Sequence, residues 1–289
     1  YLNPLLAGDV RSCFSMTEPD VAGSDPTLIQ TTAVEDGDDW VINGHKWFTS
    51  GARGASFAIV IARTDPDAEI PQARNSAFIV DCDSPGFEIV RDIETMSGSH
   101  NHCEILYKDV RVPKTNLLGE RGGGHKLGQV RLGPARLAHC MRWLGEIEMA
   151  LEMLIERAQN RFAHGSLLSE KQSIQWMMSD SAMELYASKL MVLHAAYKIE
   201  NGMEFKQEVS MAKHHVANTL WKVCDRAVQV HGALGYSKDS PLSGMLQQAR
   251  WARLADGADE VHQMRIADLL MRAYDESGSI NGAVGGLPL

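Results

Sequence analysis

Short runs of β-branched and aromatic residues occupy the first part of the chain, from about Ser12 to Pro113. Asp, Gly and Pro residues separate these runs, and no helical periodicity lies between them. Such runs predict short strands, of which the clearest are Ser56–Ala62, Ser76–Val80, Phe87–Val90 and Cys103–Val112. The pattern favours an antiparallel barrel or sandwich over a parallel α/β sheet.

A β-hairpin is predicted within the same region. Trp40–Ile42 and His45–Thr49 both have strand-like composition, and Asn43-Gly44 stands between them. Asn-Gly supplies the positive φ angles that a two-residue type I′ turn requires. The sequence therefore predicts a hairpin with its turn at Asn43-Gly44.

The hydrophobic period changes to three and four residues beyond a glycine-rich loop at Gly119–Gly124. This spacing predicts one face of a long helix that Arg136 opens: Leu137, Met141, Leu144, Ile147, Leu151 and Leu154. Further helices are predicted over Glu170–Glu200, over Lys206–Val230, and from about Met245 to Tyr274 with Gly257 inside. Methionines at core spacing are interpreted as packing residues, namely Met141, Met149, Met153, Met177, Met178, Met183 and Met191. The whole is predicted to be an α+β chain.

Composition narrows the class of protein. The 289 residues include 28 Lys and Arg and 37 Asp and Glu, a formal net charge of −9. This balance argues against a nucleic-acid-binding protein, because a polyanion would be repelled overall. No run of ~18 apolar residues predicts a membrane span. Five cysteines without a C-x-x-C motif indicate a reducing compartment, and no signal-peptide pattern follows Tyr1, so secretion is not expected.

Several familiar site motifs are absent or incomplete in this sequence. There is no nucleophile elbow, Walker A sequence or H-E-x-x-H motif. Gly122–Gly128 fits no G-x-G-x-x-G register and is interpreted as a flexible turn between domains. His100–Cys103 resembles a metal cluster, but neighbouring strand residues point to opposite faces, so a turn into the next strand is favoured. His214 and His215 diverge by about 100° on a helix, and no metal site is predicted.

Two segments do carry candidate chemistry. Cys13–Asp25 begins as a strand and ends in a Pro/Gly/Ser loop, where small residues let exposed backbone N–H groups approach a ligand. His45–Gly51 places an aromatic residue for stacking beside a hydroxyl group. Taken separately, each segment is equally well explained as the end of a hairpin with a buried Trp.

Together the two segments resemble the acyl-CoA dehydrogenase family, in which T-E-P…G-S-D and W-x-T-[NS]-G form the flavin-facing edge of a β domain. Other segments follow in family order, from about Leu2 to Tyr274. They are Thr95–Gly98, the strand Cys103–Pro113 (F-x-D-V-x-V-P), Arg161–Gly165 (R-x-x-F-G) and Gln229–Tyr236 (Q-x-x-G-G-x-G-[YF]). The resemblance implies a central antiparallel β-barrel domain followed by a C-terminal four-helix bundle.

The resemblance also implies domain limits. We expect residues 1–11 to be a remnant of the family's N-terminal helical domain, whose other helices, one wall of the acyl-CoA cleft, are expected to be missing. Residues 12–118 are predicted to form the middle β domain, residues 119–276 the helical bundle, and residues 277–289 a tail.

FAD is the cofactor that the resemblance implies. Six residues correspond to the wall and hydrogen-bonding groups around the isoalloxazine ring: Phe14, Met16, Thr17, Trp47, Phe48 and Thr49. Gly23 and Ser24 correspond to a loop that touches both flavin and the pantetheine of the substrate. Arg161, Gln229 and Gly232 correspond to positions that reach the adenine dinucleotide of FAD in a neighbouring subunit, where a guanidinium suits pyrophosphate oxygens.

For two arginines a second interpretation explains the sequence as well. Arg161 is also explained as a solvated arginine at a helix end. Arg136 corresponds to a substrate-binding position near the CoA end, but an ion pair between domains explains it equally well.

The predicted catalytic base lies in Arg253–His262. Many family members read Y-E-G-T-x-Q-x-x-R here with Glu as the base, and this chain has Asp256 in that place, followed by Gly257 at a substrate position. Ala258 and Glu260 stand where cofactor-binding Thr and Gln are usual. The wording resembles the branch typified by acyl-CoA dehydrogenase family members 10 and 11. The alternative is that Asp256 is a simple N-cap before Ala258.

The implied function is α,β-dehydrogenation of an acyl-CoA thioester to the trans-2-enoyl-CoA in fatty-acid β-oxidation, with long-chain or 2-methyl-branched substrates. Asp256 would take the α proton while the β hydrogen leaves as hydride to the flavin. The implied partners are an electron-transfer flavoprotein and further copies of the chain, in a homodimer or homotetramer. The implied compartment is the mitochondrial matrix or peroxisome in a eukaryote and the cytoplasm in a bacterium. An acyl-CoA oxidase and a non-catalytic flavin-binding assembly module are the alternatives.

Overall fold

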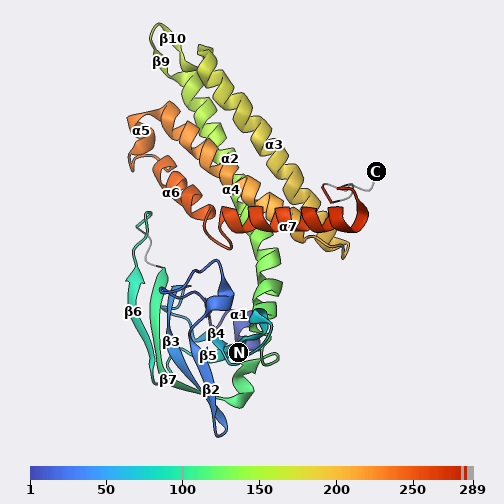
Figure 1. Ribbon diagram of the computed structural model, residues 1–289. Coiled ribbons are helices and arrows are strands. Elements are labelled where there is room, and N and C mark those ends of the chain that lie inside the picture. The colour runs from blue at the N-terminus through green and yellow to red at the C-terminus, as the bar shows by residue number, and fades with distance from the viewer. Residues whose placement is uncertain (99–100, 281–282, 285–289) are drawn as a thin grey trace. The chain divides into compact units, whose positions relative to one another are not determined.

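Figure 1 shows the computed structural model, which describes residues 1–98, 101–280 and 283–284. Internal contacts divide the chain into a first unit, Tyr1–Arg131, and a second unit, Leu132–Leu289. The first unit, called here the sheet unit, contains the strands β1 to β8. The second, called here the helical unit, contains most of α2 and all later helices. The arrangement of a sheet domain followed by a helical domain is therefore confirmed.

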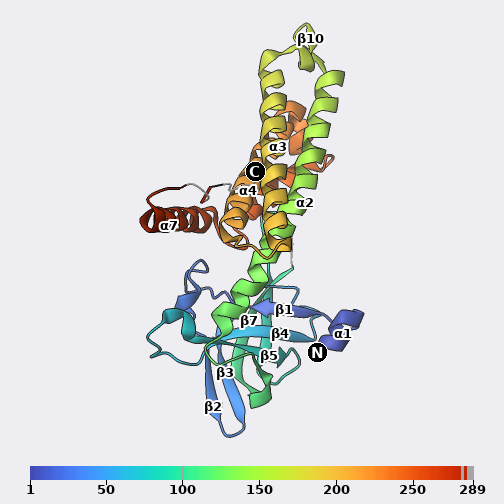
Figure 2. The ribbon, with the colours of Figure 1, turned by 90° about the vertical axis from the view of Figure 1, so that its right-hand side faces the viewer.

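The sheet unit begins with a short helix, α1 (Leu2–Ala7). Its sheet follows the order β6-β7-β3-β2-β4-β5-β8, and β1 pairs with β4 beside that path. Figure 2 shows β1, β4 and β5 side by side. The strands are β1 (Ser12–Ser15), β2 (Thr32–Asp36), β3 (Asp39–Ser50), β4 (Phe57–Arg63), β5 (Asn75–Asp81), β6 (Phe87–Ile93), β7 (His102–Pro113) and β8 (Leu117–Leu118).

The predicted strand runs all lie in strands apart from Ser56, which precedes β4, but the pairing differs from the prediction in two respects. Most pairs are antiparallel, whereas β1 with β4 and β2 with β4 are parallel. The sheet is also open along its described path from β6 to β8, so closure into a barrel is not confirmed. Strand β4 is buried along nearly its whole length, which explains its continuous apolar sequence, because a strand covered on both faces does not alternate.

The hairpin predicted at Asn43-Gly44 is wrong, since both residues lie inside the single strand β3. The turn lies earlier, between β2 and β3, where Gly37 has a φ of 62°. Gly44 is needed for another reason: an added Cβ would collide with the Thr31 side chain. The Asn43 side chain exchanges two hydrogen bonds with Asp109, at 3.0 Å and 2.8 Å. Close approach between segments, rather than a turn, therefore explains the Asn-Gly pair.

The helical unit is built around α4, which packs against α3, α6 and α7. A small hairpin, β9 (Phe162–Ala163) with β10 (Ser166–Leu167), joins α2 to α3. The helices are α2 (Gly124–Asn160), α3 (Gln172–Glu200), α4 (Lys206–His231), α5 (Ala233–Tyr236), α6 (Leu242–Ala252) and α7 (Asp259–Ser277). In the described residues no helix is both long enough and apolar enough to span a bilayer.

The first long helix starts earlier than predicted. It begins at Gly124 rather than at Arg136 and continues through Pro134. The glycine-rich segment predicted to be a flexible turn leads directly into it. An added Cβ on Gly122 would lie 2.7 Å from the Ala73 carbonyl oxygen, and one on Gly124 would lie 2.7 Å from the Ser76 carbonyl carbon. These glycines allow backbone segments to touch, so the prediction of a flexible turn is wrong.

The helix predicted from Met245 to Tyr274 is two helices, α6 and α7. Between them Asp256 has a φ of 52° and Gly257 a φ of 107°. Two consecutive residues with positive φ cannot continue a right-handed helix. The core prediction also needs correction at Met141, Met149 and Met183, whose side chains are exposed.

Candidate functional site

The residues that the sequence assigns to the site form two groups, one in each unit. The sheet unit carries the segments around Thr17 and Trp47, and the helical unit carries the break between α6 and α7.

In the sheet unit, the two motif segments are joined through their backbones. The Trp47 N–H donates to the Thr17 carbonyl at 3.0 Å, and the Thr17 hydroxyl donates to the Trp47 carbonyl at 2.8 Å. The neighbouring Phe48 ring lies edge-on to Trp47, with centroids 5.0 Å apart. Phe48 has a φ of 50° and is 42% exposed. A non-glycine residue held in this region costs about 1–3 kcal/mol, and such residues cluster at functional sites.

A buried ion pair fixes the loop that follows Thr17. Lys46 donates to Glu18 at 2.9 Å and to the Met16 carbonyl at 2.7 Å. The Glu18 carboxylate also accepts the N–H groups of Gln30 and Thr31, at 2.7 Å and 2.9 Å. Burial raises the pKa of Glu18, but the Lys46 charge and these hydrogen bonds outweigh it and hold that pKa below its usual value. The Lys46–Glu18 pair thus holds the two ends of this loop together.

The loop itself presents small residues to solvent. Gly23 and Ser24 are exposed, and the hollow between the loop and its own base is only about 10 Å³. The loop is therefore packed on itself with Gly23 and Ser24 outward, in the manner of a ligand-binding turn.

Thr49 is placed differently from Trp47 and Phe48. Its side chain is fully buried, and its hydroxyl lies 3.2 Å from that of Ser15, to which Tyr107 also donates at 3.0 Å. Burial raises the pKa of Tyr107 far above its usual value, so it remains a donor. A structural role explains Thr49 in this arrangement, and its contact with flavin stays a prediction.

The other members of the sheet group line a partly apolar surface. Phe14 and Met16 are half-buried and pack on a small cluster around Ile29. The Arg131 guanidinium lies 5.1 Å from the centre of the Phe14 ring, a cation–π contact. The exposed Phe48 beside Trp47, together with the outward loop at Gly23, suits a planar aromatic ring with polar edges. These residues therefore fit an isoalloxazine ring.

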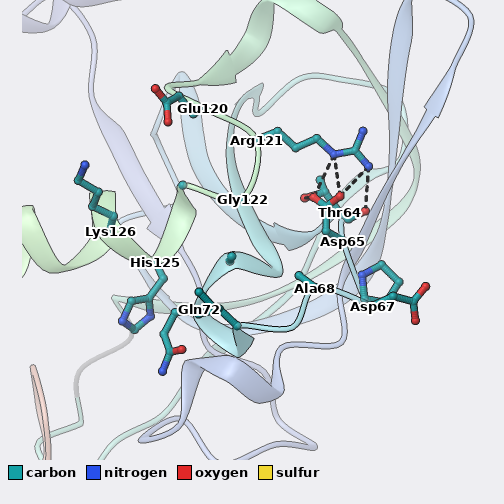
Figure 3. A pocket seen from close by; sticks show the side chains of 14 residues that line it. Thr64, Asp65, Asp67, Ala68, Gln72, Glu120, Arg121, Gly122, His125 and Lys126 are labelled. Atoms are coloured by element: carbon teal, nitrogen blue, oxygen red, sulfur yellow. Dashed lines mark hydrogen bonds and ion pairs between the residues drawn. The ribbon is translucent and has the colours of Figure 1, made fainter.

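A hollow of about 780 Å³ in the sheet unit lies elsewhere. Residues 64–73 and 120–126 supply its lining, and none of the predicted site residues is among them. Figure 3 shows Arg121 turned toward Asp65 and Thr64. Its hydrogen bonds to Asp65 lower the pKa of that carboxyl group and occupy the guanidinium. The Arg121 guanidinium is therefore engaged by Asp65 and not directed toward a ligand in this hollow.

In the helical unit, two cationic side chains hold the break between α6 and α7. Arg136 donates to the carbonyl of Asp256 at 2.7 Å, and Lys213 donates to the carbonyl of Gly257 at 2.6 Å. Lys213 is fully buried, and this burial lowers its pKa to about 8. Carbonyl groups turned the wrong way for a helix would otherwise be unsatisfied, so the two donors stabilise the left-handed turn.

Asp259 and His262 complete the underside of this turn. Asp259 is buried and accepts from Arg253 at 2.7 Å and from Asn218 at 3.1 Å. An added Cβ on Gly257 would lie 2.8 Å from Nε2 of His262. Burial, with help from the nearby cations, lowers the pKa of His262 to about 4, so its ring is neutral near pH 7. Only Gly fits at position 257.

The Asp256 carboxylate lies on the other side of this turn. Its Oδ2 atom is 3.0 Å from Nε2 of His139, and the two side chains are 22% and 20% exposed. The interpretation of Asp256 as an N-cap is wrong, because α7 begins at Asp259 and its N-cap is Ala258, which makes no side-chain cap. Asp256 and Asp259 therefore have separate partners and separate roles.

The remaining predicted residues lie at exposed element ends. Arg161 follows α2 and Gly232 follows α4 with a φ of 62°. Gln229 and Glu260 are exposed on α4 and α7. In the part of the chain that the structure describes, no hydrogen bond or ion pair joins Arg161 to Gln229, so their role toward a neighbouring FAD stays a prediction.

Metal binding gains no candidate from the structure. Across residues 1–98, 101–280 and 283–284, no three His, Cys, Asp or Glu side chains are grouped to hold an ion. In the predicted turn at residues 100–103, His100 lies outside the described residues. His102 instead lies 2.7 Å from the Ser50 hydroxyl through Nδ1.

Comparison with known proteins connects the two groups to one family. Residues 13–110 match the acyl-CoA dehydrogenase middle domain, and residues 122–271 match the acyl-CoA dehydrogenase C-terminal domain. The chain belongs to the acyl-CoA dehydrogenase family. The sheet group lies within the first match and the helical group within the second.

Individual relatives agree with this membership. The probable acyl-CoA dehydrogenase FadE2 of Mycobacterium tuberculosis is 45% identical over 92% of this chain and 67% of its own length. Human acyl-CoA dehydrogenase family member 11 is 39% identical over 94% of this chain, which spans 36% of that relative. A solved structure of a putative acyl-CoA dehydrogenase from Mycobacterium abscessus has a TM-score of 0.90 and 38% identity, covering 95% of this chain and 69% of that one.

Within this acyl-CoA dehydrogenase chain, sequence reasoning missed the residues that hold the site residues in place. Glu18, Lys46, His139 and Lys213 are all of this kind. Glu18 and Lys46 lie inside the quoted motifs and could have been recognised. His139 lies three residues after Arg136, so the two share a helix face, but nothing in the sequence connects them to Asp256.

Proposed function

We propose that the chain catalyses FAD-dependent α,β-dehydrogenation of an acyl-CoA thioester, with Asp256 as the base that removes the α proton. The observation that carries this proposal is the carboxylate at the α6–α7 break. It is partly exposed on a turn whose two carbonyl groups are fixed by Arg136 and Lys213. A carboxylate held without reorganisation in this way is a preorganised base.

The carboxylate needs help to act as a base. A reference aspartate has a pKa of about 4, which is low for removing a carbon-bound proton. A bound substrate would exclude water from Asp256 and so disfavour its charged form, which strengthens it as a base. Arg136 and Lys213 act on the backbone of the turn, so they position the side chain. FAD, when bound, supplies the two-electron acceptor for the β hydrogen.

Residues of the sheet group are proposed to hold the flavin ring. Phe48 and Trp47 offer aromatic surface, and the loop at Gly23 and Ser24 offers exposed backbone donors. The Lys46–Glu18 pair keeps that loop closed at its base. We propose an electron-transfer flavoprotein as the acceptor of electrons from the reduced flavin.

The test is anaerobic mixing of the FAD-loaded protein with acyl-CoA thioesters of different length and branching. Bleaching of the oxidised flavin absorbance with formation of the enoyl-CoA is the expected result, and we expect long-chain or 2-methyl-branched substrates to be fastest. Bound FAD that no acyl-CoA reduces would contradict dehydrogenation and favour an assembly module. Fast reoxidation by air after reduction would assign the protein to the oxidases.

A homo-oligomer is proposed from an apolar stripe on α3. Six exposed residues, 45–66% accessible, recur at spacings typical of a coiled-coil seam: Trp176, Met183, Tyr186, Leu190, Leu193 and Tyr197. A stripe of this kind marks an interface, and its heptad spacing fits the same helix of a second copy. By light scattering, Leu193→Glu should reduce the mass of the assembly while Met264→Glu, an exposed position on α7, should not. A monomeric parent protein would refute the assembly.

A further inference from the structure

The ring of His139 is fixed on two sides at the edge of the proposed site. It stacks on Trp143, with centroids 5.4 Å apart and planes inclined by 26°, and it meets the edge of Trp251 at 5.5 Å. Its Nε2 atom lies 3.0 Å from Oδ2 of Asp256. The imidazole therefore has one orientation relative to the carboxylate.

The other nitrogen of the ring fixes the position of its proton. Nη2 of Arg142 lies 2.7 Å from Nδ1 of His139. A guanidinium has donors and no acceptor, so Nδ1 must accept this hydrogen bond and carries no proton. The single proton of a neutral ring is then on Nε2, the nitrogen that lies 3.0 Å from Oδ2 of Asp256. A protonated ring would instead set an N–H group against the guanidinium.

We infer that neutral His139 is a positioning residue for Asp256, donating its Nε2 proton to Oδ2 and so fixing the rotation of the carboxylate. This inference rests on the proposed function, because it assigns His139 a role only if Asp256 is the base. In this arrangement Arg142 favours the tautomer of His139 that carries its proton on Nε2. The path runs from Arg142 through His139 to Asp256 and uses no group outside the helical unit.

Other charged and titratable groups also surround this pair. On α2 they are Arg136, Cys140 and Arg142, on α4 Lys213 and His214, on α6 the C-cap Arg253, and on α7 Asp259 and His262. Arg136 and Lys213 bind main-chain carbonyls, and Arg253 binds Asp259. Burial raises the pKa of the Cys140 thiol to about 12, so it stays protonated. Of the contacts named here, that of His139 reaches the Asp256 carboxylate, with Nε2 3.0 Å from Oδ2.

Two variants of similar size separate the donor from the ring. His139→Phe keeps an aromatic ring between Trp143 and Trp251 but removes the donor, whereas His139→Gln keeps a donor at about the same reach and removes the ring. Misplacement of a catalytic group by about 1 Å can cost about 100-fold. We expect His139→Phe to slow anaerobic flavin reduction by about 10–100-fold with little change in KM, and His139→Gln to recover part of the rate.

The pH profile supplies a readout that a merely structural residue would not change. Loss of a donor removes stabilisation of the charged carboxylate, so in His139→Phe the acid limb of the rate profile should move to higher pH. In His139→Gln the limb should stay near that of the parent. An acid limb and rate in His139→Phe equal to those of the parent would overturn the inference.

Asp256→Asn in the same assay distinguishes a failure of the proposed base from a failure of the positioning role of His139. If Asp256→Asn reduces flavin at the parent rate, the proposed base is wrong and the inference falls with it. If Asp256→Asn is slow but His139→Phe and the parent have the same rate and pH profile, only the positioning role is wrong. Equal far-UV spectra and melting temperatures of His139→Phe and the parent would show that the fold is retained.

Discussion

A fully buried lysine supports the predicted site segment in each unit. The two lysines differ in the groups that would lose a partner if the lysine were replaced. Lys46 in the sheet unit and Lys213 in the helical unit each donate to a main-chain carbonyl next to a predicted site residue, and burial lowers the pKa of each to about 8. Lys46 also pairs with the buried carboxylate of Glu18. In the described structure Lys213 has no carboxylate within ion-pair distance.

The difference shows that similar burial does not mean similar energetics. Breaking a buried ion pair leaves an uncompensated charge. Removing Lys213 leaves an unsatisfied carbonyl and weakens a longer-range attraction to Asp256 and Asp259. The sheet unit therefore depends on its lysine for stability, and the helical unit depends on its lysine for the shape of one turn.

The largest effect on stability is expected from Lys46→Met. The Glu18 carboxylate would remain buried without its cation, which typically costs 3–5 kcal/mol. Urea unfolding followed by Trp fluorescence measures the loss. The double variant Lys46→Met with Glu18→Gln should be less destabilised than the sum of the two single variants. Simple additivity would contradict coupling between the two residues.

Lys213→Met should cost less, about 1–3 kcal/mol, because the Gly257 carbonyl loses its donor but no close ion pair is broken. Relative to its effect on stability, the effect of Lys213→Met on the rate of flavin reduction should be large. The left-handed turn at Asp256 and Gly257 would lose one of its two supports, so flavin reduction should slow while FAD binding is retained. A variant as unstable as Lys46→Met, with an unchanged rate of reduction, would reverse the contrast.

A pH dependence of stability is expected from both lysines. Each has a pKa of about 8 in the folded chain and an ordinary value of 10.5, so between these values the unfolded chain binds more protons. Stability therefore rises with pH over this interval and is lost as the pH falls through about 8. Unfolding free energies measured at pH 8 and pH 10 should show this rise. Lys213→Met should make it smaller, and an equal rise in that variant would contradict the assignment.

Local patterns predicted most of the fold, and tertiary contacts explain the errors. Strand composition and helical spacing were sufficient for β4 to β7 and for α3 and α4. They failed at Gly44 and Gly124, where the glycine is required by a neighbouring segment rather than by a turn. At Asp256-Gly257 they predicted one helix, because a glycine inside a helical pattern does not by itself reveal two consecutive positive φ angles.

The site divides in the same way. Asp256 and the residues of the motif segments were assigned from the sequence through the family resemblance. The residues that support them were not assigned. Lys46 and Lys213 are of a residue type that is usually exposed, and their partners are distant along the chain. Burial of a lysine is a tertiary property, and so is the approach of His139 to Asp256.

The rate of flavin reduction in Asp256→Asn decides whether Asp256 is the base. Asn keeps the shape of the side chain but cannot accept the α proton, and general bases commonly contribute ~10²–10⁴-fold. Asp275→Asn, the same substitution at an exposed position of α7, is the matched control. In anaerobic stopped-flow mixing with the best acyl-CoA of the panel, Asp256→Asn should retain bound FAD and reduce it at least 100-fold more slowly, while Asp275→Asn matches the parent. Equal rates for Asp256→Asn and the parent would contradict the account.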